Sequence, residues 1–259
     1  MADGKVKISA VLCTINEDHY LEECLLSLAW VNEIIVCDMG STDRTVAIAQ
    51  KSGCTIYSVA KVPYVELLRK QAVSYCHNDW ICFVDPDFIL PEGFADIAQR
   101  ELLHDQNISC LYMAYVNHYK NRPIRHGRWG AVGYYPIIFH KKMINILPVL
   151  HGGFEINRGT QRFLPPEEYI RHMWVRDEDH FYQKHVRYIS YEGERRVALG
   201  WKPSVLRQVV SVLKLLYIYI TDGYKDGAIG FDLMKKSIWY EWNAEQALAE
   251  NYVSHCKTV

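Results

Sequence analysis

The sequence lacks several features that would place a protein quickly in a class. None of its eight cysteines forms a C-x-x-C pair, so we expect buried free thiols in a reducing compartment and no zinc site. The formal net charge of -1 supplies no overall field for nucleic acid, so no nucleic-acid partner is expected. The N-terminal segment has a short apolar run without a cleavage region, which differs from a signal peptide. We therefore expect a cytoplasmic protein.

What is present is a composition typical of a folded protein. Hydrophobic residues make up 49% and charged residues 23% of 259 positions, enough for one large domain with a small appendage. The first part of the chain alternates apolar runs with segments of helical periodicity. Strands are predicted at 6–12, 34–37, 55–59 and 80–84, and helices at 18–28, 42–51, 65–76 and 91–103.

This alternation predicts βαβ units, and hence an α/β fold with a mostly parallel sheet. Residues 134–140 resemble a further strand, and the turn-rich segment 151–169 is predicted to be a long active-site loop. From Asp177, a predicted helix cap, the chain becomes helical. We expect one domain over 1–175 and a helical C-terminal extension over 176–259.

Polar residues follow the predicted strands. In parallel sheets, ligands bind at the carboxyl ends of the strands, so we expect these residues to form one site. Taken singly, each group also suits a turn or a helix cap, and Asp87 can cap the helix that follows it. The residues are Thr14, Asn16, Glu17, Asp38, Gly40, Ser41, Arg69, Asp85 and Asp87.

The pair Asp85 and Asp87 carries the clearest chemistry. Two carboxylates at the end of an apolar strand are costly unless they are paired, solvated or bound to a metal. Pro86 fixes the backbone between them, so both can present oxygens to a hard divalent ion. Mn²⁺ or Mg²⁺ suits such ligands, whereas Zn²⁺ prefers histidine or cysteine.

The order of these motifs resembles the family-2 inverting glycosyltransferases of the GT-A fold. The matching stretches are ISAVLCTINEDHYLEECLLSLAWVNEIIVCDMGSTDRTVAIA and LLRKQAVSYCHNDWICFVDPDF. The sequence is most similar to the branch that adds sugars to the lipopolysaccharide inner core and related glycans. The resemblance implies transfer of a sugar from a nucleotide-sugar donor, UDP-linked in the first instance, to a glycan or lipid-linked acceptor with Mn²⁺ or Mg²⁺ as cofactor.

The resemblance also implies roles for individual residues. Thr14 and Glu17 would lie at the nucleobase and ribose, and Asp38 would contact the base. Asn16, Gly40 and Ser41 belong to the same donor-binding set. Arg69 would face the diphosphate or the aspartate pair, although Lys70 replaces the asparagine usual beside it. Asp85 would contact the ribose or a metal-bound water, and Asp87 would bind the metal.

The catalytic base has three candidates. An inverting transfer needs a carboxylate that takes the proton from the acceptor hydroxyl. The branch often has a His-Glu pair in the loop after the sheet, where this sequence reads HGGFE, so Glu155 is the nearest substitute. Glu168 and Asp179 are the alternatives. His172 matches a histidine of the same branch and suits a metal or diphosphate contact, or else an ordinary core position.

The segment 204–216 predicts an amphipathic helix with a polar stripe opposite valines and leucines. It is too short and too charged to span a bilayer, which needs about 20 apolar residues. It suits a helix at a membrane surface, or one that packs on the catalytic domain or on a partner chain in an oligomer. The resemblance favours a peripheral position on the inner face of the membrane.

Two other functions are weighed against sugar transfer. A nucleotidyltransferase would be expected to carry a glycine-rich loop after the first strand, and TINEDHY has no glycine. A catalytically impaired glycan- or nucleotide-binding protein of the same fold would explain the altered base position, whereas the retained aspartates argue against it.

Overall fold

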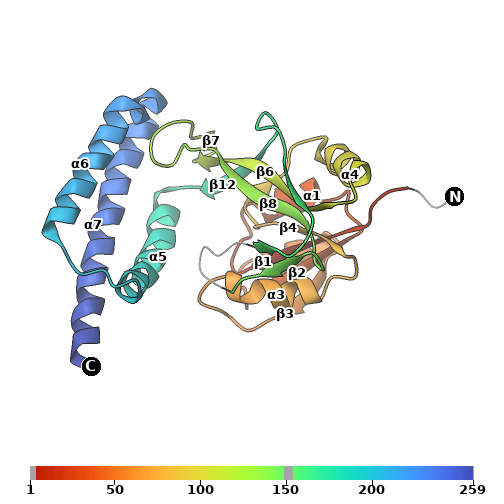
Figure 1. The fold of residues 1–259 in the computed structure, drawn as a ribbon, viewed down its shortest axis with the longest axis horizontal. Coiled ribbons are helices and arrows are strands. Elements are labelled where there is room, and N and C mark those ends of the chain that lie inside the picture. Colours follow the sequence, from red (N-terminus) through yellow and green to blue (C-terminus); the bar gives the residue numbers. More distant parts are fainter. Residues whose placement is uncertain (1–3, 149–153, 259) are drawn as a thin grey trace. The chain divides into compact units, whose positions relative to one another are not determined.

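The computed structural model describes residues 4–148 and 154–258 (Figure 1). The chain divides into two compact units, one formed by residues 1–115 and 133–173 and the other by residues 116–132 and 174–259. The first unit carries most of the sheet, and the second is mainly helical. Residues 116–132 belong to the second unit although they precede the predicted division at residue 175.

The main sheet is parallel in its first half. Its order is β3-β2-β1-β4-β8-β6-β12-β5, and β7 and β11 also pair with β6. The parallel strands are β1 (Ile8–Thr14), β2 (Glu33–Asp38), β3 (Thr55–Ser58) and β4 (Trp80–Phe83). The inner strands β1, β2 and β4 are covered on both faces and are mostly apolar, whereas the edge strand β3 is partly exposed.

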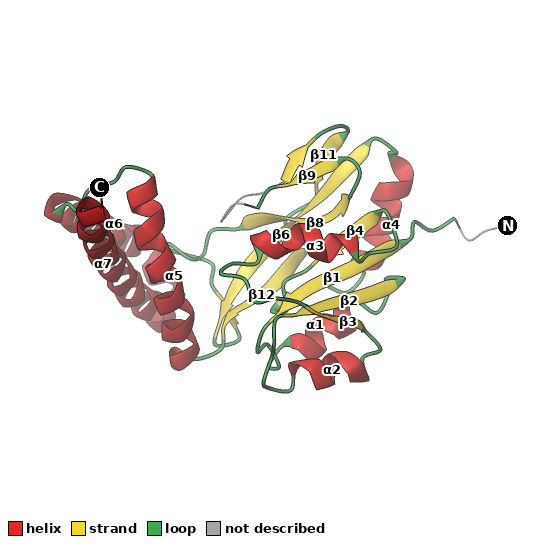
Figure 2. Ribbon diagram, turned by 90° about the horizontal axis from the view of Figure 1, so that it is seen from below, coloured by secondary structure: helices red, strands yellow, loops and turns green. Residues whose placement is uncertain are grey.

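Alternate residues of β1 face two separate clusters of side chains. Ala10 and Leu12 pack in the cluster that contains apolar residues of α1 (Leu21–Ser27) and α4 (Phe94–His104). Val11 and Cys13 pack in the cluster that contains α3 (Glu66–Ser74). A further helix, α2 (Thr45–Lys51), adds Ile48 to the first cluster. Figure 2 shows these helices beside the strands. The α/β fold predicted from the sequence is confirmed.

The second half of the sheet is mixed, which the sequence did not predict. In it, β8 pairs antiparallel with both β4 and β6, and β12 pairs antiparallel with β5. The strands beyond β4 therefore no longer all run in the direction of β1 to β4. The strands of this half are β5 (Phe88–Ile89), β6 (Ile108–Tyr119), β7 (Arg122–Pro123), β8 (Gly133–His140), β11 (Thr160–Phe163) and β12 (Tyr169–Val175).

The predicted long loop at 151–169 is wrong in part, because it contains two strands. The first is β10 (Phe154–Ile156), which pairs with β9 (Ile144–Ile146), and the second is β11. Phe163 of β11 stacks on Tyr112 of β6 with ring centroids 4.6 Å apart. The turn-forming residues therefore mark turns between short strands. The first three residues of the predicted loop, 151–153, lie outside the described residues.

The second unit is built on α5 (Glu178–Ala198), α6 (Val205–Thr221), a 3-10 turn (Gly223–Asp226) and α7 (Gly227–Thr258). The predicted cap at Asp177 is confirmed, since its carboxylate accepts a hydrogen bond from the His180 N–H at 2.7 Å. The buried Lys236 ammonium lies 2.9 Å from Glu178 and 3.0 Å from Asp232, so the charge on α7 is paired with the start of α5.

The seven cysteines whose side chains the structure describes are free thiols, and all of them except Cys54 are buried, as the sequence predicted. Among the described residues, no helix combines the length and the apolarity needed to cross a bilayer.

Candidate active site

The candidate site begins where β1 and β2 end side by side. The parallel register pairs Thr14 with Asp38, the last residues of the two strands. Both side chains are buried, and the Thr14 hydroxyl donates to Asp38 Oδ1 at 3.4 Å. Two residues that are separated by a helix in the sequence are thus brought together at the carboxyl edge of the sheet.

The Asp38 carboxylate organises the turn that follows it. It accepts hydrogen bonds from Gly40 N at 3.0 Å, Ser41 N at 3.1 Å and Ser41 Oγ at 2.5 Å. Gly40 has a φ of 90°, a left-handed conformation that favours glycine. The predicted helix start at residue 42 is wrong by a few residues, because α2 begins after Arg44, and Ser41 is bound to Asp38 instead of capping the helix. Contact of Asp38 with a nucleobase stays a prediction.

A second set of hydrogen bonds links the loops after β1 and β2. The Asn16 N–H donates to Ser41 Oγ at 2.9 Å, and Asn16 Oδ1 accepts from the Thr42 N–H at 2.8 Å. The Glu17 N–H donates to Thr45 Oγ1 at 2.8 Å. Asn16 itself has a φ of 55°, a conformation that asparagine tolerates better than most residues. Six of the predicted donor-binding residues, all except Arg69 and Asp85, therefore lie in one connected pair of loops.

The aspartate pair follows β4 and meets His172 from a distant part of the chain. The Phe88 N–H donates to the Asp85 carbonyl at 2.9 Å, which turns the chain into β5. There Phe88 pairs with His172 of β12. This pairing brings His172 Nε2 within 3.3 Å of Asp87 Oδ2, with both side chains less than a fifth exposed. The residues predicted to bind metal, Asp87 and His172, thus lie together.

These residues fit a divalent ion that also binds a substrate. Within the described ranges, no group of three or more histidine, cysteine, aspartate or glutamate side chains is arranged to hold a metal. Mg²⁺ is usually held by one or two carboxylates together with substrate phosphates and waters. One carboxylate and one imidazole, at Asp87 and His172, suit that manner of binding and differ from a closed structural zinc site.

Arg69 lies buried near the end of β4. Its side chain is 3.9 Å from Glu66, and its guanidinium carbon is 5.4 Å from the centre of the Phe83 ring. Burial by itself would lower the pKa of Arg69, but the neighbouring Tyr135, Asp85 and Glu66 outweigh it and raise the pKa. The guanidinium is therefore a permanent positive charge near Asp85.

Tyr135 on β8 is the residue near this charge that the sequence analysis missed. The sequence predicted a strand at 134–140, which is β8, but not that this strand returns antiparallel beside β4. Burial, with the negative charge of Asp85, raises the pKa of the Tyr135 hydroxyl well above its ordinary value.

The three candidates for the catalytic base are exposed carboxylates in different elements. Glu155 on β10 accepts a hydrogen bond from Asn145 Nδ2 at 3.2 Å. Glu168 lies between β11 and β12, and Asp179 is in the first turn of α5, which belongs to the second unit. The described contacts assign none of these three as the base, which stays a prediction.

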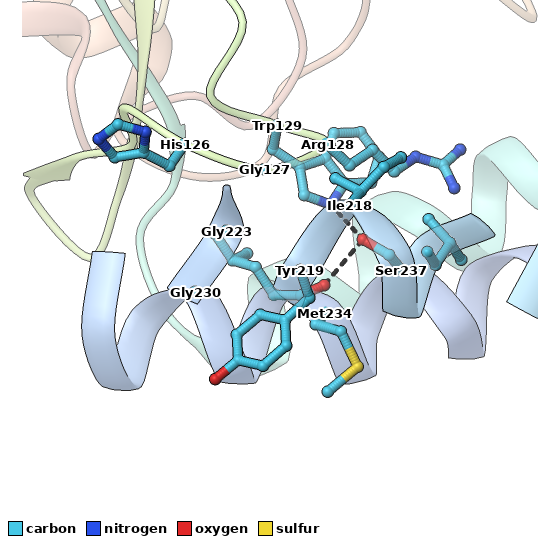
Figure 3. A pocket seen from close by; sticks show the side chains of 12 residues that line it. His126, Gly127, Arg128, Trp129, Ile218, Tyr219, Gly223, Gly230, Met234 and Ser237 are labelled. Atoms are coloured by element: carbon cyan, nitrogen blue, oxygen red, sulfur yellow. Dashed lines mark hydrogen bonds between the residues drawn. The ribbon is translucent and has the colours of Figure 1, made fainter. Parts of the chain in front are cut away.

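The second unit has a small hollow of its own (Figure 3). Residues 126–129 line it together with side chains of α6 and α7, and the Trp129 indole N–H donates to Ser237 Oγ at 2.7 Å. Ser237 in turn donates to the Leu233 carbonyl at 2.8 Å. None of the lining residues belongs to the loops after β1 and β2 or to the Asp85–Asp87 turn. The hollow therefore reflects packing within the helical unit.

Relatives cover the chain to different extents. The lipopolysaccharide core biosynthesis glycosyltransferase LpsC of Rhizobium meliloti (strain 1021) is 23% identical over 242 residues, which are 88% of this chain and 86% of the relative. An uncharacterized glycosyltransferase of Rickettsia conorii is 34% identical over 110 residues, 42% of this chain. That match spans about 38% of the relative's length.

Among solved structures, a glucosyl-3-phosphoglycerate synthase from Mycobacterium tuberculosis, crystallised with Mn²⁺ and UDP-glucose, is 28% identical and covers 44% of each chain with a TM-score of 0.36. The family described as Glycosyl transferase family 2 matches residues 9–163, more than half of the chain. The matched region contains the linked loops after β1 and β2 and the Asp85–Asp87 turn. This protein therefore belongs to glycosyl transferase family 2.

Proposed function

We propose that the protein is an inverting glycosyltransferase. It moves a sugar from a nucleoside diphosphate sugar, with a UDP-sugar as the first candidate, to a hydroxyl of a glycan or lipid-linked acceptor. The observation that supports this best is the contact between Asp87 and His172 beside the loops of Asp38 and Asn16. The relative from Rhizobium meliloti, named for lipopolysaccharide core biosynthesis, supports an envelope glycan as acceptor.

In this proposal the loops after β1 and β2 hold the nucleoside. Their mutual hydrogen bonds keep the backbone in place before a ligand arrives, so little ordering remains to be done on binding. Arg69 provides a fixed positive charge for the diphosphate. Asp87 and His172 would hold a Mn²⁺ or Mg²⁺ ion, which as a Lewis acid stabilises the negative charge that the departing diphosphate gains.

The transfer also needs a proton acceptor. A carboxylate takes the proton of the acceptor hydroxyl while that oxygen bonds to the anomeric carbon and the bond to the diphosphate breaks. Glu155 is our first candidate because it lies on a short strand of the sheet-containing unit and its side chain is exposed. Glu168 and Asp179 remain the alternatives.

A panel of donors tests the proposal. Wild-type protein with Mn²⁺ or Mg²⁺ is incubated with UDP-, GDP- and dTDP-sugars, and release of the nucleoside diphosphate is measured with and without EDTA. We expect metal-dependent release from one donor class, UDP-sugars first. Release of pyrophosphate from a nucleoside triphosphate would instead indicate a nucleotidyltransferase, and binding without turnover would indicate a non-catalytic protein.

We further propose that α6 places the protein on an anionic membrane surface, the cytoplasmic face of the envelope. Its exposed apolar side chains recur along one side of the helix, with Val205 77%, Leu206 74% and Leu213 59% exposed. At about 100° per residue, all the exposed apolar side chains of α6 together fall on an arc of roughly 140° around the helix axis. They are Val205, Leu206, Val209, Val210, Leu213, Leu216, Tyr217 and Ile220. The helix has no acidic residue. Of its two basic residues, Arg207 is paired with Glu245 of α7, and the exposed Lys214 is the one that suits anionic head groups.

Vesicle sedimentation tests this surface. The full chain should sediment with vesicles containing phosphatidylglycerol and less with pure phosphatidylcholine. Leu206→Gln with Leu213→Gln should abolish sedimentation, whereas Leu103→Gln, an exposed leucine on α4, should not. Equal binding to both vesicle types would refute the charge argument. A dimer that the α6 substitutions dissociate would show that a second copy covers this helix.

A further inference from the structure

The packing of the fold does not explain why the hydroxyl of Tyr135 is buried. Its oxygen is buried and makes no hydrogen bond to any residue that the structure describes. A buried hydroxyl without a partner destabilises a protein, and in native structures such a group usually serves a bound water, an ion or a ligand. The question is therefore which ligand atom this hydroxyl meets.

The position of Tyr135 follows from the antiparallel pairing of β8 with β4. That register pairs Trp80 with His140 and Cys82 with Ile138. Continued past its last pair, it brings Tyr135 to about the level of Asp85. The Tyr135 ring also packs edge-to-face on Phe88, with ring centroids 4.9 Å apart. Phe88 follows Asp87 directly, so Tyr135 contacts the turn that carries the aspartate pair.

The surroundings favour an anionic acceptor for this hydroxyl. A phenol is protonated at neutral pH, so the Tyr135 hydroxyl can donate a hydrogen bond. Arg69, whose charge acts on Tyr135, adds guanidinium donors in the same region. Two donor groups beside a predicted metal site suit phosphate oxygens, because hydrogen bonds to ionised acceptors are stronger than those between neutral groups.

We propose that Tyr135 is a donor-binding residue whose hydroxyl donates a hydrogen bond to a phosphate oxygen of the nucleotide-sugar, alongside Arg69. This inference rests on the proposed function, since it assumes a nucleoside diphosphate at the strand ends. Tyr135 takes no part in bond making or breaking. It holds the diphosphate in place and favours ligands with phosphate over the bare nucleoside.

The test compares Tyr135→Phe with Tyr134→Phe, its neighbour on β8, which is 39% exposed. Calorimetry with Mn²⁺ should show UDP affinity lowered about 10- to 100-fold in Tyr135→Phe, as expected for a lost hydrogen bond to a charged group. Affinity for uridine should not change. Without ligand, Tyr135→Phe should melt at or above the wild-type temperature, because it removes a buried hydroxyl that had no partner. Tyr134→Phe should match the wild type in every measurement.

Three results would overturn the assignment. UDP affinity in Tyr135→Phe could equal that of the wild type, uridine could lose as much affinity as UDP, or the unliganded variant could melt several degrees lower. The last result would reveal a partner inside the protein. If the proposed function is wrong, the wild-type protein itself should bind none of UDP, GDP or dTDP. That result would also remove the assignment of Tyr135.

Discussion

Replacing Asp38 by alanine should both destabilise the first unit and weaken nucleotide binding. The carboxylate accepts hydrogen bonds from Gly40 N, Ser41 N, Ser41 Oγ and Thr14 Oγ1. Alanine leaves all of these donors without their acceptor. Because Asp38 is only 6% exposed and Thr14 is fully buried, water can replace the carboxylate only in part.

The size of the effect follows from these contacts. A hydrogen bond to a charged group contributes about 1.5–3 kcal/mol, and the Gly40 and Ser41 donors lie near solvent, so water recovers part of their loss. We expect a net loss of about 2–4 kcal/mol in the free energy of unfolding. For a unit of this size the melting temperature should fall by about 5–10 °C. UDP affinity should fall too, because Ser41 also anchors Asn16 in the facing loop.

Thermal and denaturant unfolding of the full chain would measure the loss, and calorimetry would measure UDP affinity. Asp38→Asn retains one acceptor oxygen and should cost about half as much. Glu92→Ala, at an exposed carboxylate, serves as the control and should leave both quantities unchanged. An Asp38→Ala protein with wild-type melting temperature would refute the reasoning, and unchanged UDP affinity would refute the predicted role of Asp38 at the nucleotide.

Three further predictions concern the metal, the base and pH. Asp87→Ala should abolish Mn²⁺- or Mg²⁺-dependent donor turnover and leave the fold intact, and full activity in EDTA would contradict this. Glu155→Gln should lower kcat by about 10²–10⁴-fold at unchanged UDP affinity; if Glu168→Gln does so instead, the base is Glu168. Burial lowers the pKa of His185 to about 4, so the unfolded chain, with an ordinary histidine pKa of about 6.5, binds the proton more tightly. Stability should therefore fall between about pH 6.5 and 4, by at most about 3 kcal/mol, and a pH series on His185→Phe should lose this dependence.

Much of the first half of the fold was predictable because the signals for its strands and helices lie within short stretches of the sequence. The apolar run before Thr14 and the helical periodicity after it indicate a strand and a helix without any distant contact. Parallel strands joined by helices end at one edge of the sheet, so polar residues after consecutive strands had to converge there. The placement of Thr14 beside Asp38 follows from this rule.

The sequence by itself therefore determined the βαβ architecture and which residues form the linked loops after β1 and β2. Tertiary structure decided what depends on antiparallel pairing between distant segments. The β5–β12 pair places His172 against Asp87, and the β4–β8 pair brings Tyr135 toward Asp85. Such pairings carry no local signal, because strand periodicity sets which face a side chain occupies but not which strand lies beside it.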